Sequence, residues 1–218
     1  MSIAVSTSPQ NAISNITDLI DEVRDEMDDD AFDRERILRS IGRAEARFNR
    51  ELRTPQMETA ILFMATEEIT DLPNDFLQMR LIYQEGTPDS PLQPLAPAQL
   101  RRGFQGVAGR PRAYAIENRR IIIAPVGSTA LQMTYYQRIP ALTDDNPTNW
   151  LIDEHPDLYL HQVLANLFNK IGDGEKAASN LAITNDLIAQ IQAAAQTSAW
   201  GSGPLHPRRS CGVRGVII

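Results

Sequence analysis

The sequence of 218 residues contains one cysteine, Cys211, and three histidines. A single cysteine excludes an intrachain disulfide and a cysteine-based zinc site. The histidines at positions 155, 161 and 206 lack the i, i+4 spacing that places two metal ligands on one helix face. The sequence therefore predicts neither a metal site nor a disulfide framework, and the lack of disulfides favours synthesis in a reducing compartment.

A basic surplus and a long apolar run are also missing. The chain has 21 lysines and arginines against 28 aspartates and glutamates, which gives a formal charge of −7. Proteins that grip nucleic acid over a broad face usually carry a basic surplus. No uninterrupted apolar stretch approaches the roughly 18 residues that a membrane helix needs. These two absences predict no broad nucleic-acid face and no membrane partner.

Catalytic motifs are equally scarce. The stretch "GFQGVAGR" at 103–110 has repeated glycines, but it lacks the GK[ST] ending of a phosphate-binding loop and its strand–helix context. No acid and base residues pair beyond chance. The sequence therefore predicts no enzymatic activity and no cofactor.

Helical and strand patterns alternate along the chain. Apolar residues recur at helical spacing from Ile13 to Met27 and from about Asp33 to Leu52, and again in helices over 156–171 and 175–197. Between them, residues 58–138 contain β-branched, alternating segments that predict four or five short, mainly antiparallel strands. The expected fold class is α+β, an antiparallel bundle of about four helices with an inserted small antiparallel β domain.

The same patterns predict a division of the chain. We expect a flexible N-terminal arm over 1–11, an N-terminal helical hairpin over 12–55, a β-rich insertion over 56–148, C-terminal bundle helices over 149–197, and an extended C-terminal arm over 198–218. The helices can pack together only if the β-rich insertion is an excursion from their bundle.

Two groups of like charges stand out. One lies on and after the first predicted helix, and we interpret it as either a solvated surface or an acidic interface or channel-lining face: Asp21, Glu22, Asp25, Glu26, Asp28, Asp29 and Asp30. The other makes the β-rich insertion locally basic, where it could contact a DNA backbone or an acidic neighbouring subunit: Arg101, Arg102, Arg110, Arg112, Arg119 and Arg120.

The C-terminal segment differs from the rest of the chain. From residue 198 it holds three arginines and no acid, and it ends in three aliphatic residues. It is either a frayed end or an arm that orders on a partner, and the terminal aliphatics favour the arm because they gain burial only on a partner. The candidate docking residues are Leu205, Arg208, Arg209, Arg214, Val216, Ile217 and Ile218.

The stretch "RIPALTDDNPTNWLIDEHPDLYLHQVL" at 138–164 joins the last predicted strand to a helix. Its Asn-Pro and Thr-Asn pairs are turn and capping residues, and Trp150 with Leu151 can fill apolar space between the sheet and the bundle. The candidate junction residues are Asn146, Pro147, Asn149, Trp150, Leu151, Pro156 and Tyr159.

This junction resembles the head-to-tail adaptor proteins of tailed bacteriophages, also called connector or head-completion proteins. The resemblance is carried by "YYQRIPAL", "NPTNWL" and "PDLYL", and upstream by "DLPNDFLQMRLIY", "PLQPLAPAQL" and "GRPRAYAIENRRIIIAP", in that order. It covers roughly residues 35–195. The acidic first helix and the segment from residue 203 to the end match no motif of the family.

The resemblance implies a role and a set of partners. It implies a structural virion protein, made in the host cytoplasm, whose copies form a ring, commonly of twelve, beneath the portal. It implies contacts with the portal protein through the C-terminal arm, with a tail or nozzle protein, and with neighbouring copies. The packaged DNA would pass through the ring without sequence-specific binding.

Two other readings stay open at this point. The first is a DNA-packaging accessory protein similar to a small terminase, which would need a basic recognition helix where these helices are acidic or neutral. The second is a small enzyme with a site in a β-barrel. DNA binding at physiological salt would favour the first, and turnover of a substrate the second.

Overall fold

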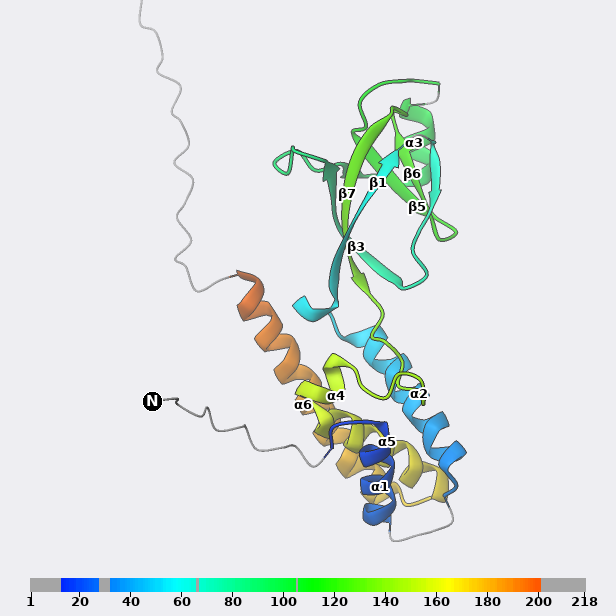
Figure 1. Ribbon diagram of the computed structural model, residues 1–218, viewed down its shortest axis with the longest axis vertical. Helices are drawn as coiled ribbons and strands as arrows, with labels where there is room; N and C mark the ends of the chain where they lie inside the picture. Colours follow the sequence, from blue (N-terminus) through cyan, green and yellow to red (C-terminus); the bar gives the residue numbers. More distant parts are fainter. Residues whose placement is uncertain (1–12, 28–31, 66, 105, 201–218) are drawn as a thin grey trace, which may run out of the picture.

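The computed structural model describes residues 13–27, 32–65, 67–104 and 106–200, of which 198–200 are described by their backbone alone. The described chain forms a helical bundle with a β region above it (Figure 1). This is the α+β fold expected from the sequence, with the strands in two small, mainly antiparallel sheets.

Four long helices build the bundle: α1 (Ile16–Met27), α2 (Arg34–Glu51), α5 (Pro156–Ile171) and α6 (Gly174–Trp200). Helix α5 is central and packs against α1, α2 and α6, and also against the short α4 (Trp150–Glu154). Its aromatic and aliphatic side chains, such as Tyr159 and Val163, are fully buried. The apolar stripes of the outer helices are buried against it, as their 3.6-residue spacing predicts.

The helix ends follow from local capping. Asp33 precedes α2 and caps it, since its Oδ1 accepts from the Arg36 backbone N–H at 3.0 Å. Helix α1 was expected from Ile13, but Asn15 accepts from the N–H groups of Thr17 and Asp18 at 2.8 and 3.0 Å and starts the helix at Ile16. The last helix reaches Trp200, three residues beyond the end predicted from the sequence.

The β region contains two sheets. The first has the order β1-β7-β3, with β1 (Glu58–Ala65), β7 (Thr129–Gln137) and β3 (Phe76–Gln84) all antiparallel. The second has the order β2-β6-β5-β4, with β2 (Ile69–Asp71), β6 (Arg120–Ala124), β5 (Ala113–Glu117) and β4 (Gln93–Pro94). The described residues thus form seven strands, where the sequence predicts four or five, because β2 and β4 are too short to show an alternating pattern.

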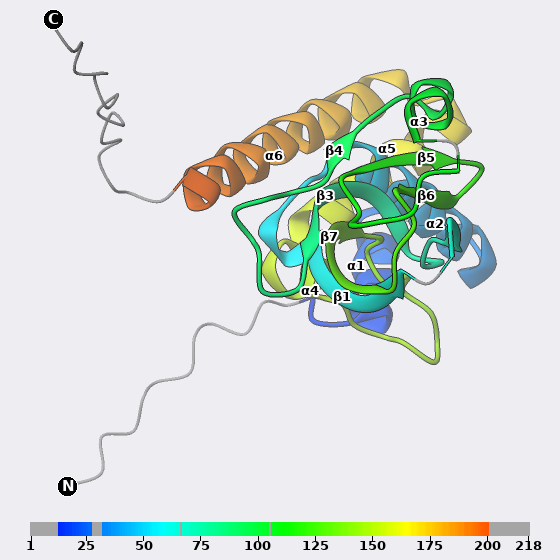
Figure 2. The same cartoon turned by 90° about the horizontal axis from the view of Figure 1, so that it is seen from above.

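The two sheets pack face to face around a core separate from that of the bundle. Leu131, Met133 and Tyr135 of β7 meet Ile121 and Ile123 of β6 across it. Helix α3 (Pro97–Phe104) covers the second sheet through Leu100, in a small third cluster. Seen from above, the β region stands over the bundle, and the C-terminal half of α6 extends beyond both (Figure 2).

Candidate functional site

The chain crosses between the bundle and the β region twice. It leaves through residues 52–58, which include the 3-10 turn η1 (Pro55–Met57), and it returns through residues 137–149. We call these two segments the neck. Met57, Ile139 and Leu142 are buried there and extend the bundle core to Leu77 and Tyr136 at the base of the first sheet. The neck is therefore packed with side chains, in contrast to a solvated linker.

Asn149 organises the end of the return segment. Its Oδ1 caps α4 by accepting from the N–H groups of Leu151 and Ile152 at 3.1 and 2.9 Å. Its Nδ2 donates to the Pro140 carbonyl at 2.8 Å and to the Tyr159 hydroxyl at 2.9 Å. One buried amide thus joins the return segment, α4 and α5, and no other side chain of that size offers both two donors and an acceptor.

Two polar side chains of α2 hold the return segment from the other side. The Glu45 carboxylate accepts from the Leu142 backbone N–H at 2.7 Å, and Asn49 Oδ1 accepts from the Ile139 N–H at 2.9 Å. Residues four apart lie on one helix face, so the pair meets two backbone groups of the passing chain. Because buried backbone N–H groups need acceptors, these contacts fix where the return segment lies on α2.

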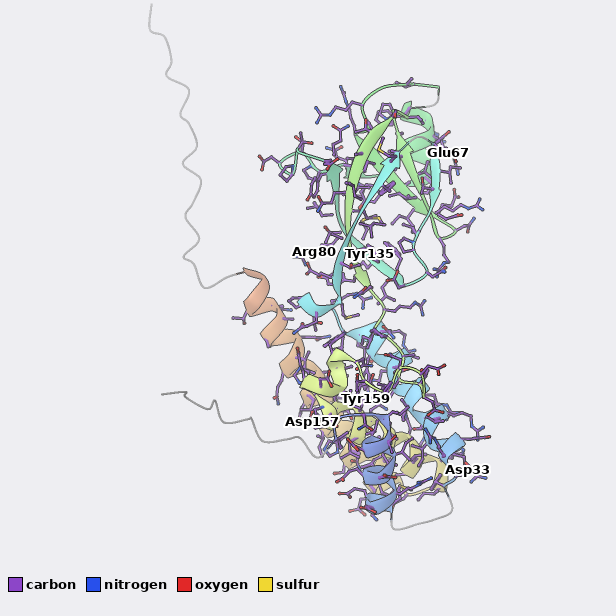
Figure 3. All side chains as sticks on the ribbon, viewed as in Figure 1. Asp33, Glu67, Arg80, Tyr135, Asp157 and Tyr159 are labelled. Carbon is purple, nitrogen blue, oxygen red and sulfur yellow. The ribbon has the colours of Figure 1, made fainter. Side chains whose placement is uncertain are left out.

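The Tyr159 hydroxyl closes this network. It lies 2.9 Å from Asn149 Nδ2 and 3.4 Å from Glu45 Oε1, and its ring meets that of Phe48 edge to face at 5.2 Å. Burial and the nearby Glu45 raise the pKa of Tyr159 far above its ordinary value. Burial also raises the pKa of Glu45, against the lowering effect of its hydrogen bonds from Leu142 and Tyr159. Figure 3 shows Tyr159 within the bundle, below Arg80 and Tyr135 of the sheets.

Arginines brace the outbound segment against the first sheet. Arg53 donates to Gln78 Oε1 at 3.0 Å, and its guanidinium lies 5.9 Å from the Tyr136 ring centre. Arg80 lies 5.8 Å from the same ring, donates to the Tyr136 hydroxyl at 2.7 Å, and pairs with Glu58 at 2.7 Å. The neck is thereby tied to β1, β3 and β7 together.

The side chains of the other predicted junction residues lie outside the hydrogen-bond network of Asn149 and Tyr159. Leu151 is fully buried in the bundle core, and Trp150 is half-buried against it. Asn146 closes an exposed turn by donating to the Ala141 carbonyl at 2.9 Å, and the Pro147 carbonyl accepts from the Ile16 N–H at 2.9 Å. Pro156 occupies the first turn of α5, where no N–H partner is needed.

An open groove of about 410 Å³ runs between the neck and the C-terminal half of α6. Thr54, Trp150 and His155 line one side, and Leu187 and Ile191 of α6 line the other. Thr54 is 2% exposed, and its hydroxyl has no hydrogen-bond partner in the described part of the chain.

A family model described as "SU10 adaptor protein" matches residues 14–208, which is most of the chain. The chain belongs to this adaptor family. It is a family of phage head-to-tail adaptors, so the suspected relationship is confirmed and the chain has an adaptor role in the virion. No curated protein matches the chain.

Membership of this family indicates where the protein acts and what it contacts. A phage adaptor is a structural protein of the virion that contacts portal and tail components, and the family is not a known enzyme family. Within the described residues, no group of histidine, cysteine or acidic side chains is arranged to hold a metal ion. None of the described helices has the length and apolar character needed to cross a bilayer.

The acidic candidates of this adaptor lie on α1. Asp21, Asp25 and Glu26 are exposed and Glu22 is half-buried, on the side opposite the buried stripe of Leu19 and Val23. Asp21 pairs with Arg24 at 3.6 Å. The remaining acidic candidates, Asp28, Asp29 and Asp30, lie outside the described residues.

The basic candidates do not form one patch. Arg110 and Arg112 lie before β5, whereas Arg119 and Arg120 lie at the turn after it, so the length of the strand separates the pairs. Several are engaged: Arg101 pairs with Glu117, Arg120 pairs with Asp71 at 3.0 Å, and Arg119 donates to the Asn74 carbonyl at 3.1 Å. The arginines are therefore dispersed over the β region and do not form one continuous basic patch that could follow a DNA backbone.

The C-terminal candidates, Leu205, Arg208, Arg209, Arg214, Val216, Ile217 and Ile218, also lie outside the described residues. Glu45, Asn49 and Arg53 were not among the predicted site residues. The spacing of Glu45 and Asn49 indicates only that the two side chains share one face of α2.

Proposed function

We propose that copies of this chain form a ring, of twelve subunits, beneath the portal of the capsid. The ring extends the DNA channel and joins the capsid to the tail through a tail or nozzle protein. The family match over residues 14–208 carries this proposal. Packaged DNA passes through the ring without sequence-specific contact.

The neck supports a ring-forming role. A closed ring multiplies any angular error between subunits, so each subunit must hold its two parts in a fixed relation. The contacts of Asn149, Glu45 and Asn49 pair buried polar groups of the return segment and fix its position on the bundle. Buried polar networks that are fully satisfied specify a unique arrangement.

The C-terminal segment supplies the contact with the portal. Figures 1 and 2 show α6 projecting from the bundle, so the end of α6 at Trp200 lies away from the body of the subunit. The segment is basic and ends in aliphatic residues. We propose that its arginines meet acidic groups on the portal and that Val216, Ile217 and Ile218 enter apolar pockets there.

The exposed acids of α1 suit a surface that DNA must pass or that a basic neighbour must meet. Carboxylates repel the phosphate backbone, so an acidic channel wall would not retain DNA. Asp21, Asp25 and Glu26 are exposed on one face of α1 and can serve either purpose.

Electron microscopy of the chain mixed with the portal ring of its own virus tests this function. We expect an additional twelve-subunit ring beneath the portal, with density running from each subunit toward it. A chain lacking residues 198–218 should fold and leave the portal bare, whereas a control with Arg208, Arg209 and Arg214 changed to Lys should still bind. A bare portal with the full chain would contradict the ring, and normal assembly by the truncated chain would contradict the docking arm.

A further inference from the structure

Strand β1 is an open edge. It pairs with β7 on one side over all eight of its residues, with no break in register. On its other side, no backbone hydrogen bond to any described residue is recorded. An edge of this length presents a row of unpaired N–H and C=O groups that can receive another strand.

The edge also lacks the features that normally prevent strand addition. Its sequence, "ETAILFMA", contains no proline, glycine, lysine or bulge. Its one charge, Glu58, lies at the neck and is paired with Arg80. Proteins usually protect an edge strand with such residues or cover it, so a bare edge of this kind points to a partner that covers it.

The outward face of the same sheet is apolar as well. Leu62 and Met64 of β1 are 58% and 54% exposed, and Leu81 of β3 is 37% exposed. Their neighbours on β7 at this face, Gln132 and Thr134, are uncharged. The partner at this edge should therefore be uncharged.

A slot opens beside the edge. It is an open cavity of about 270 Å³ between β1 and the segment that follows β2, with Ile61 and Phe63 on one wall and Leu72 on the other. Its floor is formed by core residues Ile121 and Met133, each 1% exposed. A strand added to β1 would direct every second side chain into this slot, because side chains alternate across a strand.

We propose that residues 2–8 of a neighbouring copy add to β1 as a further strand. This segment reads "SIAVSTS", so Ile3, Val5 and Thr7 alternate with small residues. Ile3 and Val5 fill the slot, and Ala4 lies beside Leu62 on the outward face. The segment carries no charged side chain, matching the uncharged face, and Pro9 ends it.

Other segments of the chain fit this edge less well. The last 18 residues contain three arginines and two prolines. Among the described edges, β2 has three residues and β4 has two, too short to cover eight. The remaining edge, β3, has nine residues, but two register shifts interrupt it and residues 91 and 92 already pair with its C-terminal end. Pairing of β1 with β1 would join two copies about a two-fold axis and stop there, whereas a ring needs two different surfaces on each copy. The choice of a neighbouring copy rests on the proposed ring.

Disulfide trapping tests the pairing. Two full-length chains with different tags, both with Cys211→Ser, carry either Leu62→Cys or Ala4→Cys, and they are mixed and oxidised. We expect linked heterodimers well above the yield from a control pair in which exposed Glu35→Cys replaces Leu62→Cys. Equal yields would overturn the inference. So would a predominance of links between two Leu62→Cys chains, or a link within one chain that carries both changes.

Self-association gives a second, independent readout. Ile3→Asp with Val5→Asp places charge in the slot, whereas Ser2→Asn with Ser6→Asn adds uncharged polar groups on the outward side of the strand. The first pair of changes should weaken self-association by at least about tenfold, because it buries unpaired charge. The second pair should weaken it much less. Equal effects would overturn the assignment of Ile3 and Val5 to the slot. All four positions lie outside the described residues. Circular dichroism of both double variants checks that they fold. If the heterodimers are trapped but the portal stays bare, this inference holds and the proposed function fails. If a ring binds the portal but no heterodimers are trapped, the proposed function holds and this inference fails.

Discussion

The bundle and the β region bury their apolar residues in different ways. In the bundle, α1 and α2 bury one stripe and expose charge on the other side, as α2 does with Ile37 and Phe48 inside and Glu35 and Arg39 outside. Helix α6 differs, because its Leu181 and Ile183 are 41% and 39% exposed. In the β region, the first sheet has apolar residues on both faces, with Met133 inside and Leu62 and Met64 outside. Large apolar residues that gather at an exposed surface mark interaction sites.

The difference indicates a division of tasks. The bundle has one large core, although Ile171 of α5 and Leu181 and Ile183 of α6 are exposed. The β region has a core of its own but leaves the outward face of the first sheet and the edge strand β1 without cover in the described chain. A subunit built in this way has a core for folding and a separate apolar surface that is available for contact.

The largest effect expected from this comparison concerns buried aromatic packing. Phe48→Ala should lower the free energy of unfolding by about 3–5 kcal/mol, because it leaves a cavity against Tyr159. Leu62→Ala, at a residue 58% exposed, should change it by no more than about 0.5 kcal/mol. Urea unfolding followed by circular dichroism measures both, and similar losses would mean that the outer face of the sheet is needed by the isolated subunit.

The next effect concerns the neck. Glu45→Ala removes the acceptor of the Leu142 N–H and should cost about 1–3 kcal/mol, the penalty of a buried donor left without a partner. Glu45→Gln keeps an oxygen at that place and should cost less. Unfolding monitored by tryptophan fluorescence reports the change through Trp150; equal losses in the two variants would show that the hydrogen bond contributes little.

A smaller effect is a dependence on pH. Burial raises the pKa of Glu45 above its ordinary value of 4.5, so the folded chain keeps a proton that the unfolded chain releases. The stability of the native chain should therefore fall, relative to Glu45→Gln, as the pH rises above 4.5 and through the raised value. Unfolding free energies of both chains from pH 4 to pH 8 measure the difference; a constant difference would contradict the shift.

The smallest effect is expected at the surface of the β region. Arg120 and Asp71 form an ion pair at 3.0 Å with side chains 60% and 82% exposed. Arg120→Ala should change stability by at most about 1 kcal/mol, and less at high salt, because water and ions screen the pair. Thermal unfolding at low and high salt tests this, and a large, salt-independent loss would reveal a structural role for Arg120.

The sequence predicted most of the fold because its long elements have strong periodicity. The helical stripes and the alternating strands over 58–65 and 129–137 lie where their patterns indicate. It did not predict β2 and β4, whose few residues carry no pattern. The stretch "DLPNDFLQ" links the end of β2 to the start of β3.

The candidate site could be predicted in part for a similar reason. Asn149 could be identified as a capping residue, since the signal lies in its immediate neighbours. Glu45 and Asn49 could not, because a polar residue at the edge of a helix stripe is normally solvated. Their role depends on a segment about ninety residues later that passes over them, as the separations of 97 and 90 residues show.

The double crossing of the neck also has a mechanical consequence. A pull that separates the β region from the bundle loads two covalent links in parallel, so each carries part of the tension. A twist of one part against the other would have to wind the two links around each other. The subunit thereby resists both stretching and torsion at the neck, without a disulfide or a metal site among the described residues.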